Sequence, residues 1–352
     1  MAVNIPFGLS YNDVLLIPQL SPLKSRSQVD LSTNITQDIK LKIPLISCNM
    51  DTVTGVEMAV AISKLGGIGF IGRFDPPEVQ ANKIADIKSQ GGYSIGVIGI
   101  KDDYIKRAKM LLQAGSIALH LDVAHAHSIH VIEAIKNIKH RFPKISIIAG
   151  TVATYQGAYD LYKAGADCIK VGIGAASICI TRVMTGCGVP QITAITEAAR
   201  ASKKFKNKYL IADAGAANSG DIVKALAAGA AAYEGGSIFA GCDESPGELI
   251  EKNGILYKQY NGSTSVSEKQ RQLKKDRKNK QKHFILHVEG VEAMVKYQGN
   301  LEQVVAKLCA GIRSGFSYCG ATDILELHKK ARFIQISSAG VRESYSHDVI
   351  TV

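Results

Sequence analysis

Eight short apolar runs, rich in β-branched residues, recur between residues 44 and 236 and constrain the fold more than any other feature. They are PLIS (44–47), GIGFIG (67–72), SIGVIG (94–99), IALHLD (117–122), ISIIAG (145–150), DCIKVG (167–172), YLIAD (209–213) and AAYEGG (231–236). Between them, apolar residues recur at three- and four-residue spacing, which is typical of amphipathic helices. Strands alternating with helices predict βαβ units and a parallel sheet. Eight units, with no GxGxxG motif after the first run, favour an α/β fold of the closed (β/α)8 TIM-barrel type over a doubly wound sheet.

The length of 352 residues fits one such barrel, so we expect a single domain over residues 1–352. A long polar stretch, residues 251–299, interrupts the pattern after the eighth unit, and we interpret it as a flap or lid. Because it is polar and lacks periodicity over its first half, we expect it to be mobile without ligand. Limited proteolysis should then cut first between Lys274 and Lys282. A last helix over residues 300–313 and a tail, residues 332–352, complete the chain.

The formal net charge of +11 favours an anionic partner, either nucleic acid or a phosphorylated small molecule. Much of the excess lies in one run, Lys269 to Lys282, with eight basic residues and one acidic residue. The rest of the chain is only mildly basic, which argues against a nucleic-acid surface. The run itself is most simply a solvated face of the flap, and guidance of an anionic cofactor is the sharper alternative.

No apolar run reaches the roughly 18 to 20 residues that a membrane span needs. The N-terminus has no basic region before an apolar one, so no secretory signal is predicted, and we expect a cytoplasmic protein. Seven cysteines, an odd number without a CxxC pair, predict free thiols rather than disulfides or a zinc site.

Cys179 follows the sixth predicted strand, on the face where barrels carry their chemistry. A thiolate there would be a strong nucleophile, and Gly172 and Gly174 give its loop the freedom to bend. Thr181 and Arg182 place a hydroxyl and a cation two and three residues further on. The alternative is a buried structural cysteine, which is the commoner role of a lone cysteine.

Two glycine-containing loops follow the seventh and eighth predicted strands, where barrels usually bind phosphate. ADAGAANSGD (212–221) and EGGSIFAG (234–241) fit this role, with Asp213 placed to accept ribose hydroxyls. Taken singly, each glycine could equally serve a tight turn. The coincidence of two such loops favours a phosphate site.

The motif AHAHS (124–128) carries two histidines that could ligate a metal, but neither a carboxylate cluster nor a cysteine pattern completes a site. Hydrogen bonding at a turn or helix start is the better interpretation. Asp122, a carboxylate at a strand end, is the stronger functional candidate.

The chain resembles the family of inosine-5′-monophosphate dehydrogenase and guanosine-5′-monophosphate reductase over nearly its whole length. The motifs that carry the resemblance are YNDVLLIP (11–18), SCNMDTVT (47–54), GGIGFIGRF (66–74), LDVAHAHS (121–128), GADCIKVGIG to GCGVPQITAI (165–195), IAD to SGDIVKA (211–225), FAGCDESPGE (239–248), EGVEAMVKYQG (289–299) and IRSGFSYCGA (312–321). Their order makes the resemblance highly specific.

The resemblance implies that Cys179 attacks C2 of a purine nucleotide and forms a covalent thioimidate, while Thr181 and Glu289 activate water or ammonia. It implies a nicotinamide cofactor on the side of Asp122, which with Arg73 and Thr151 would bind it. The residues implied to hold the nucleotide are Ser177, Asp213, Gly215, Gly236, Ser237, Tyr260 and Gly262. A homotetramer is also implied, and a monovalent cation such as K⁺ near Gly172, Gly174 and Cys179.

Five positions depart from the family pattern, and one of them is Gly72, where the family has a histidine before Arg73. Gly-Pro-Gly reads Gly174-Ala175-Ala176, Asp-Gly-Gly reads Asp213-Ala214-Gly215, and Gly-Met reads Gly262-Ser263. A Cβ at Ala214 could crowd a phosphate or restrict φ. A catalytically impaired nucleotide-binding protein is therefore one alternative function.

Three features bear on the reaction direction, and the first two favour reduction. Residues 76–92 leave no room for the regulatory CBS-domain pair that the dehydrogenase usually carries. The flap also has Arg277 followed by Lys278 and no tyrosine between Asn261 and Lys296, so the Arg-Tyr pair that activates water in the dehydrogenase is missing. Both features favour NADPH-dependent reduction of GMP to IMP and ammonia, in purine salvage. The tail and residues 289–299 look more like the dehydrogenase, so a CBS-less enzyme that oxidises IMP to XMP with NAD is the alternative.

Overall fold

The computed structural model describes residues 5–101, 103–275 and 287–349, and its centre is a closed barrel of eight parallel strands. Around the barrel the strands follow the order β10-β11-β4-β5-β6-β7-β8-β9. Their bounds are β4 Leu45–Ser47, β5 Ile68–Ile71, β6 Ser94–Ile98, β7 Leu119–Asp122, β8 Ile147–Val152, β9 Cys168–Val171, β10 Tyr209–Asp213 and β11 Ala232–Gly235. Each strand coincides with one of the eight apolar runs, so the predicted (β/α)8 barrel is confirmed.

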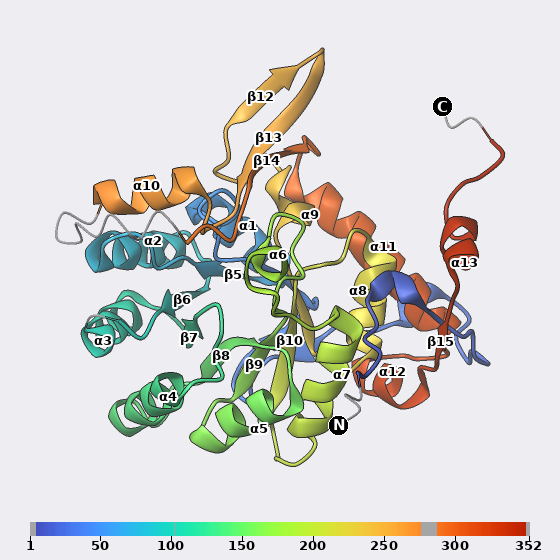
Figure 1. Cartoon of the computed structure of the whole chain (residues 1–352), viewed down its shortest axis with the longest axis horizontal. Helices are drawn as coiled ribbons and strands as arrows, with labels where there is room; N and C mark the ends of the chain where they lie inside the picture. Colours follow the sequence, from blue (N-terminus) through green and yellow to red (C-terminus); the bar gives the residue numbers. More distant parts are fainter. Residues whose placement is uncertain (1–4, 102, 276–286, 350–352) are drawn as a thin grey trace.

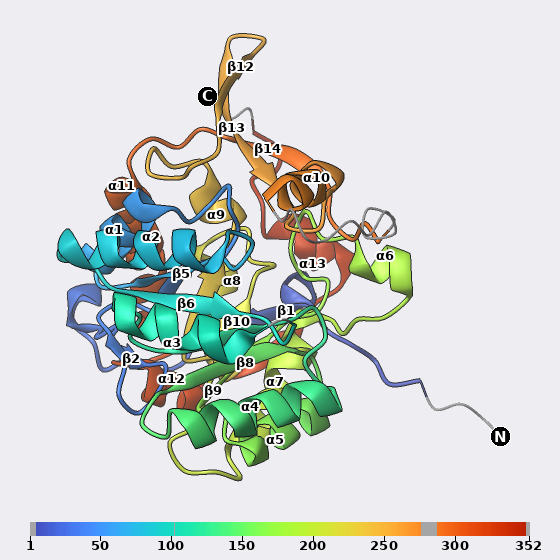
Figure 2. The same ribbon diagram turned by 90° about the vertical axis from the view of Figure 1, so that its left-hand side faces the viewer.

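Helices surround the barrel (Figures 1 and 2). They are α1 Val56–Lys64, α2 Pro77–Ser89, α3 Tyr104–Ala114, α4 Ile129–Arg141, α5 Tyr155–Ala164, α6 Thr181–Thr185, α7 Gln191–Ser202, α8 Ser219–Ala227, α9 Ser237–Ala240, α11 Leu301–Tyr318 and α12 Ile324–Lys330. The helix α4 shows why these segments are helical. Val131, Ala134, Ile135 and Ile138 form one buried stripe, and the Ser128 hydroxyl accepts from the Val131 amide at the N-cap.

The barrel interior is apolar at the end where the strands begin. Buried isoleucines from several strands meet there, among them Ile68, Ile148 and Ile211. A short hairpin, β2 (Thr33–Asn34) and β3 (Lys40–Leu41), covers this end and contributes Ile35 and Leu41, both fully buried. Side chains therefore fill this end of the barrel, and the opposite mouth is where barrels of this type bind ligands.

The flap is more regular than its sequence suggests. β12 (Leu249–Lys252), β13 (Ile255–Asn261) and β14 (Glu292–Lys296) form an antiparallel sheet whose β12–β13 hairpin projects from the barrel (Figure 1). The helix α10 spans Val266–Lys275. Strands thus form in the first half of the flap, where the sequence shows no periodicity. The polar residue Lys258 of β13 finds its partners elsewhere in the protein. Its buried ammonium donates to the carbonyls of Asp243 and Ser245 at 3.2 and 2.6 Å.

The last part of the chain returns to the first. The helix expected at 300–313 continues to Tyr318 as α11, and beyond α12 the strand β15 (Phe333–Gln335) pairs antiparallel with β1 (Val14–Leu16). Two 3-10 turns, Tyr11–Asp13 and Arg26–Gln28, and the helix α13 (Ser338–Glu343) complete the description. Among the described residues, no helix is both long and apolar enough to cross a membrane. Most of the predicted protease-sensitive segment, from residue 276 onward, lies outside the described residues.

Candidate functional site

Cys179 lies in the loop between β9 and α6, at the end of the barrel where the strands finish. Its Sγ is 3.1 Å from the Thr181 hydroxyl oxygen, and that hydroxyl donates to Glu289 Oε2 at 2.7 Å. A hydroxyl has one proton, so when Thr181 donates to Glu289 the thiol is the donor to Thr181. The structure thus joins the predicted nucleophile, hydroxyl and carboxylate in one chain of hydrogen bonds.

The backbone fixes this chain of residues. The Ile180 amide donates to the Glu289 carbonyl at 2.8 Å, and the Val291 amide donates to the Ile178 carbonyl at 3.0 Å. Cys179 and Gly290 thereby form an antiparallel bridge, although they are far apart in sequence. Because the bridge uses main-chain groups, the flap segment from Glu289 to Val291 is held in register beside the nucleophile.

Arg182 closes the loop that carries Cys179. Its guanidinium donates to the carbonyls of Ile173 and Val189 at 3.1 and 2.7 Å, one on each side of the loop. The aliphatic part of the side chain fills the space beside Gly174. We therefore infer that Arg182 maintains the conformation of the loop. Its position in the sequence near Cys179 did not indicate this role.

Several of the residues predicted to hold a nucleotide meet around Tyr260, which lies buried in β13. Its hydroxyl has hydrogen-bonding neighbours in the Ser177 side chain and the Ser237 backbone, and burial raises the pKa of Tyr260 well above its usual value. The hydroxyl also lies where a Cβ on Gly236 would be, so only glycine fits there. Gly262 packs against Gly290 and donates to the Val291 carbonyl at 3.0 Å.

The loop after β10 contains the departure at residue 214. Ala214 has φ 62°, in the left-handed region that glycine tolerates best, and its amide donates to the Glu234 carbonyl at 3.0 Å. Gly215, with φ 87°, follows it and lines a cavity of about 140 Å³ together with Ala175 and Tyr345. Ala214 therefore adopts a positive φ although its Cβ disfavours that conformation.

Asp122 ends β7 at the barrel mouth, where its side chain keeps 21% of its exposure. Asn49 donates to Oδ2 at 3.0 Å, and the Arg73 guanidinium lies against the Asp122 carbonyl at 3.3 Å. Thr151, from the end of β8, is buried and exchanges backbone hydrogen bonds with the segment after Asp122. The three residues predicted on the cofactor side thus lie together.

Sequence reasoning missed a charged cluster beneath these residues. The buried Lys170 ammonium is 2.9 Å from Asp122, 3.4 Å from Asp213 and 3.5 Å from Glu234. Burial opposes the charge on Lys170, but the three carboxylates together raise its pKa well above the usual value. Lys170 and Glu234 each stand alone as a charge near the end of an apolar run, and that position was the available signal.

The AHAHS motif forms no metal site within the part of the chain that the structure describes. Ser128 caps α4, and His127 Nε2 lies 3.0 Å from Asp160 Oδ2. Hydrogen bonding at a helix start, the preferred interpretation, matches this arrangement.

The basic run does not form one solvated face. Lys269 is buried against the His287 carbonyl, and Arg271 pairs with Asp51 and, at 2.8 Å, with Glu268. The expectation is therefore wrong for the start of the run, because α10 packs on the loop after β4.

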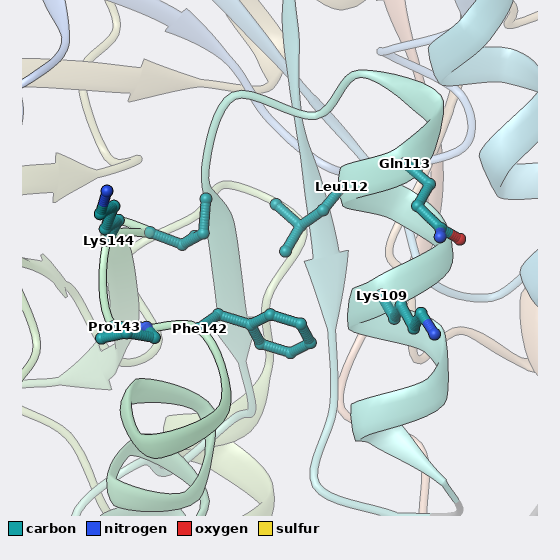
Figure 3. Close-up of a pocket in the computed structure, with 7 residues that line it drawn as sticks. Lys109, Leu112, Gln113, Phe142, Pro143 and Lys144 are labelled. Atoms are coloured by element: carbon teal, nitrogen blue, oxygen red, sulfur yellow. The ribbon is translucent and has the colours of Figure 1, made fainter.

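A larger cavity, of about 430 Å³, lies away from this site on the outside of the barrel (Figure 3). It is lined mainly by apolar atoms between α3 and the segment after α4, including Leu112, Phe142 and Ile145. It contains none of the predicted site residues.

Comparison with known proteins gives a consistent result. A family model described as the IMP dehydrogenase / GMP reductase domain matches residues 8–347. Inosine-5′-monophosphate dehydrogenase of Cryptosporidium parvum is 39% identical, over 98% of this chain and 96% of that protein. The enzyme of the same name from Nitrosopumilus maritimus is 34% identical, over 97% of this chain and 98% of that protein. The crystal structure of a GMP reductase variant from Trypanosoma brucei, in complex with guanosine 5′-monophosphate, superposes with a TM-score of 0.92 at 29% identity, covering 98% of this chain and 99% of that one.

Proposed function

Because the chain belongs to the IMP dehydrogenase / GMP reductase family, whose members are oxidoreductases that use a nicotinamide cofactor, we propose that it reduces GMP to IMP and ammonia with NADPH. The observation that carries the proposal is the hydrogen-bond chain from Cys179 through Thr181 to Glu289. It offers a nucleophile together with a path for the proton that the nucleophile must lose.

In the proposed reaction the thiol proton passes through Thr181 to Glu289, and the thiolate adds to C2 of GMP. Glu289 then returns the proton through Thr181 to the exocyclic amine, which leaves as ammonia. A thioimidate joins C2 to Cys179. A bound nicotinamide cofactor would supply hydride to C2, and release of the Cys179 sulfur from C2 would then give IMP and restore the thiolate. A purely structural cysteine would not need this proton path.

Two sets of residues fit the ligands. Ser177, Gly236, Ser237 and Tyr260, with Asp213, Gly215 and Gly262 around them, would hold the nucleotide. Asp122, Arg73 and Thr151 would bind the nicotinamide dinucleotide, which supplies the hydride. The fit of Asp122 rests on its charge: burial alone would raise its pKa, but Lys170 and Arg73 hold the pKa well below its usual range. The carboxylate is therefore ionised at neutral pH and can accept ribose hydroxyls.

The reductive direction rests on the flap. With no tyrosine between Asn261 and Lys296, the pair that would activate water is incomplete, so hydrolysis of a thioimidate should be slow. Arg277 and Lys278 themselves lie outside the described residues. Oxidation of IMP to XMP with NAD is the second candidate, favoured by the names of the relatives. A silent nucleotide binder is disfavoured, because binding alone requires none of the three linked side chains.

The direction is tested by mixing the protein with GMP and NADPH and, separately, with IMP and NAD, while following absorbance of the reduced cofactor. We expect NADPH to be consumed in the first mixture. No change there, with NADH produced in the second, would establish the dehydrogenase instead. Intact-mass measurement after incubation with nucleotide and cofactor should show an adduct on Cys179, and its absence in both mixtures would favour the silent binder.

Further properties belong to the same proposal. A monovalent cation, K⁺, would bind near Gly172, Gly174 and Cys179, and exchange of K⁺ for Li⁺ should then lower turnover. The protein would be a cytoplasmic homotetramer without nucleic-acid or membrane partners, and sedimentation analysis tests the tetramer.

A further inference from the structure

The cluster around Lys170 lies between the two predicted halves of the site. Lys170 projects from β9 toward the barrel axis, and its side chain is only 4% exposed. Its ammonium reaches Asp122 on β7 and Asp213 on β10, and both of these side chains keep 21% of their exposure at the mouth. Glu234 on β11 lies beneath them and is 1% exposed. The cation is therefore buried and the two aspartates remain within reach of ligands.

We propose that Lys170 is a positioning residue shared by both halves of the site, whose single ammonium holds the Asp122 and Asp213 carboxylates in place. The proposal rests on the proposed function, which puts Asp122 on the cofactor side and Asp213 on the nucleotide side. It adds a residue with no direct ligand contact to the set that determines affinity for both.

The contacts of Asp122 show how it is positioned. Lys170 binds Oδ1 at 2.9 Å, with His120 Nε2 3.7 Å from the same oxygen, while Asn49 binds Oδ2 at 3.0 Å, so both oxygens are held by the protein. The side chain keeps 21% of its exposure, and a carboxylate has lone pairs left to accept from a ligand. If Lys170 were lost, Oδ1 would lose its charged partner and the side chain would be free to rotate.

Asp213 depends on the same cation in a different way. Its backbone carbonyl is held by the Gln191 side chain at 2.9 Å, but its carboxylate has Lys170 at 3.4 Å as its ion-pair partner. Burial raises the pKa of Asp213, Asp122 raises it further, and Lys170 opposes both effects. Without Lys170 the two carboxylates would repel each other, and one of them would take up a proton.

The charge balance explains why one lysine suffices for three carboxyl groups. Glu234 Oε1 is 3.5 Å from Lys170, while Oε2 is buried with no hydrogen-bond partner among the described residues. Burial raises the pKa of Glu234 to about 8, so this group is mostly neutral at pH 7. Lys170 therefore lies against a glutamate that is mostly neutral at pH 7, and its charge acts mainly on the two aspartates at the mouth.

The test compares Lys170→Met, which keeps the length of the side chain without its charge, with Lys170→Arg, which keeps the charge. Lys139→Met is the matched control, since Lys139 forms an ion pair with Asp167 at 2.6 Å outside the cluster. We expect Lys170→Met to raise the KM for nucleotide and the KM for cofactor by about tenfold or more each. Lys170→Arg should recover part of both losses, and Lys139→Met should change neither.

A pH profile separates positioning from general damage to the fold. The groups that face Asp122 are Lys170, His120, Arg73, Asp213 and Glu234. Loss of Lys170 leaves burial to raise the pKa of Asp122, so the acid limb of kcat/KM for the cofactor should move to higher pH. An unchanged acid limb, or an effect on one ligand only, in a folded Lys170→Met protein overturns the proposal.

If Lys170→Met does not fold, Asp122→Asn, Asp213→Asn and the double variant decide the question. If both aspartates depend on Lys170, the losses of ligand affinity in the two single variants do not add up to the loss in the double variant. A loss in the double variant equal to the sum of the two single losses overturns the proposal. Nucleotide binding is measured calorimetrically with both GMP and IMP, and kinetics use whichever pair the wild type turns over. A wild type that oxidises IMP corrects the reaction direction and leaves the test of Lys170 intact.

Discussion

The two ends of the barrel interior are built from the same strands and carry opposite kinds of side chain. On three adjacent strands an apolar residue is followed, two positions later, by a charged one. The pairs are Cys168 and Lys170 on β9, Ile211 and Asp213 on β10, and Ala232 and Glu234 on β11. Because side chains alternate along a strand, both members of each pair face inward. A step of two residues therefore separates the part of the interior that stabilises the fold from the part available for chemistry.

The largest effect should come from the mouth. We expect Cys179→Ala to lower turnover by at least about a thousandfold, because no other group on the path to Glu289 is a nucleophile of comparable strength. Nucleotide affinity should stay within about tenfold, since most contacts are made elsewhere. Steady-state kinetics and calorimetry check the two parts. Turnover that survives in Cys179→Ala would rule out the covalent reaction.

A substitution at the closed end of the barrel should lower stability and leave ligand affinity unchanged. Ile211 is fully buried, so Ile211→Ala should lower the free energy of unfolding by about 2–5 kcal/mol, with KM unchanged at temperatures where the variant is folded. Ile211→Val is the control and should cost about 0.5–1.5 kcal/mol. Denaturant unfolding measures both. If KM changed while stability did not, the separation between the two ends would be wrong.

Thr181 sharpens the comparison within the mouth. Thr181→Val keeps the shape but removes the hydroxyl between Cys179 and Glu289, and we expect kcat to fall about a hundredfold with little change in melting temperature. Thr181→Ser keeps the hydroxyl and should retain most activity. Equal losses in the two variants would show that packing, rather than proton transfer, is the role of this residue.

The smallest effect concerns Glu234 and the pH dependence of stability. Its pKa is raised from 4.5 in the unfolded chain to about 8 in the fold, so the stabilisation is complete below 4.5 and is lost as pH rises through 8. Glu234→Gln cannot titrate, so the decline in melting temperature between roughly pH 5 and 8 should be shallower than in the wild type. An identical decline would show that Glu234 is ionised in the fold.

His120 provides a reference of opposite sign in the same layer. Burial lowers the pKa of His120 to about 3, so its contribution to stability is present above its unfolded value of 6.5 and is lost as pH falls toward 3. The two titrations change stability in opposite directions with pH, and their windows, from 4.5 to about 8 for Glu234 and from 6.5 to about 3 for His120, overlap. Melting curves of Glu234→Gln beside those of the wild type separate them.

Periodicity was sufficient to predict the barrel, because each strand and helix is encoded locally. The charged cluster was not predictable in the same way. Lys170 and Glu234 read as single interruptions in apolar runs, and only closure of the barrel shows that strands β7, β9, β10 and β11 direct these charges to one point. In the flap, Lys258 made β13 look like part of a polar loop. Its side chain is in fact buried, because its carbonyl partners lie in a different segment of the chain. Residue identity located the predicted nucleophile, whereas its link to Glu289 came from the family resemblance.

The antiparallel bridge between Cys179 and Gly290 has an evolutionary consequence. Its hydrogen bonds join main-chain atoms, so they hold one end of the flap beside the nucleophile and place almost no demand on the side chains of the rest of the flap. We expect the flap residues before Glu289 to behave as an exchangeable cassette: their number and sequence can diverge while Glu289 to Val291 return to the same register. Lineages could then change which small molecule meets the shared intermediate without rebuilding the nucleophile, and one scaffold would give rise to both reductases and dehydrogenases.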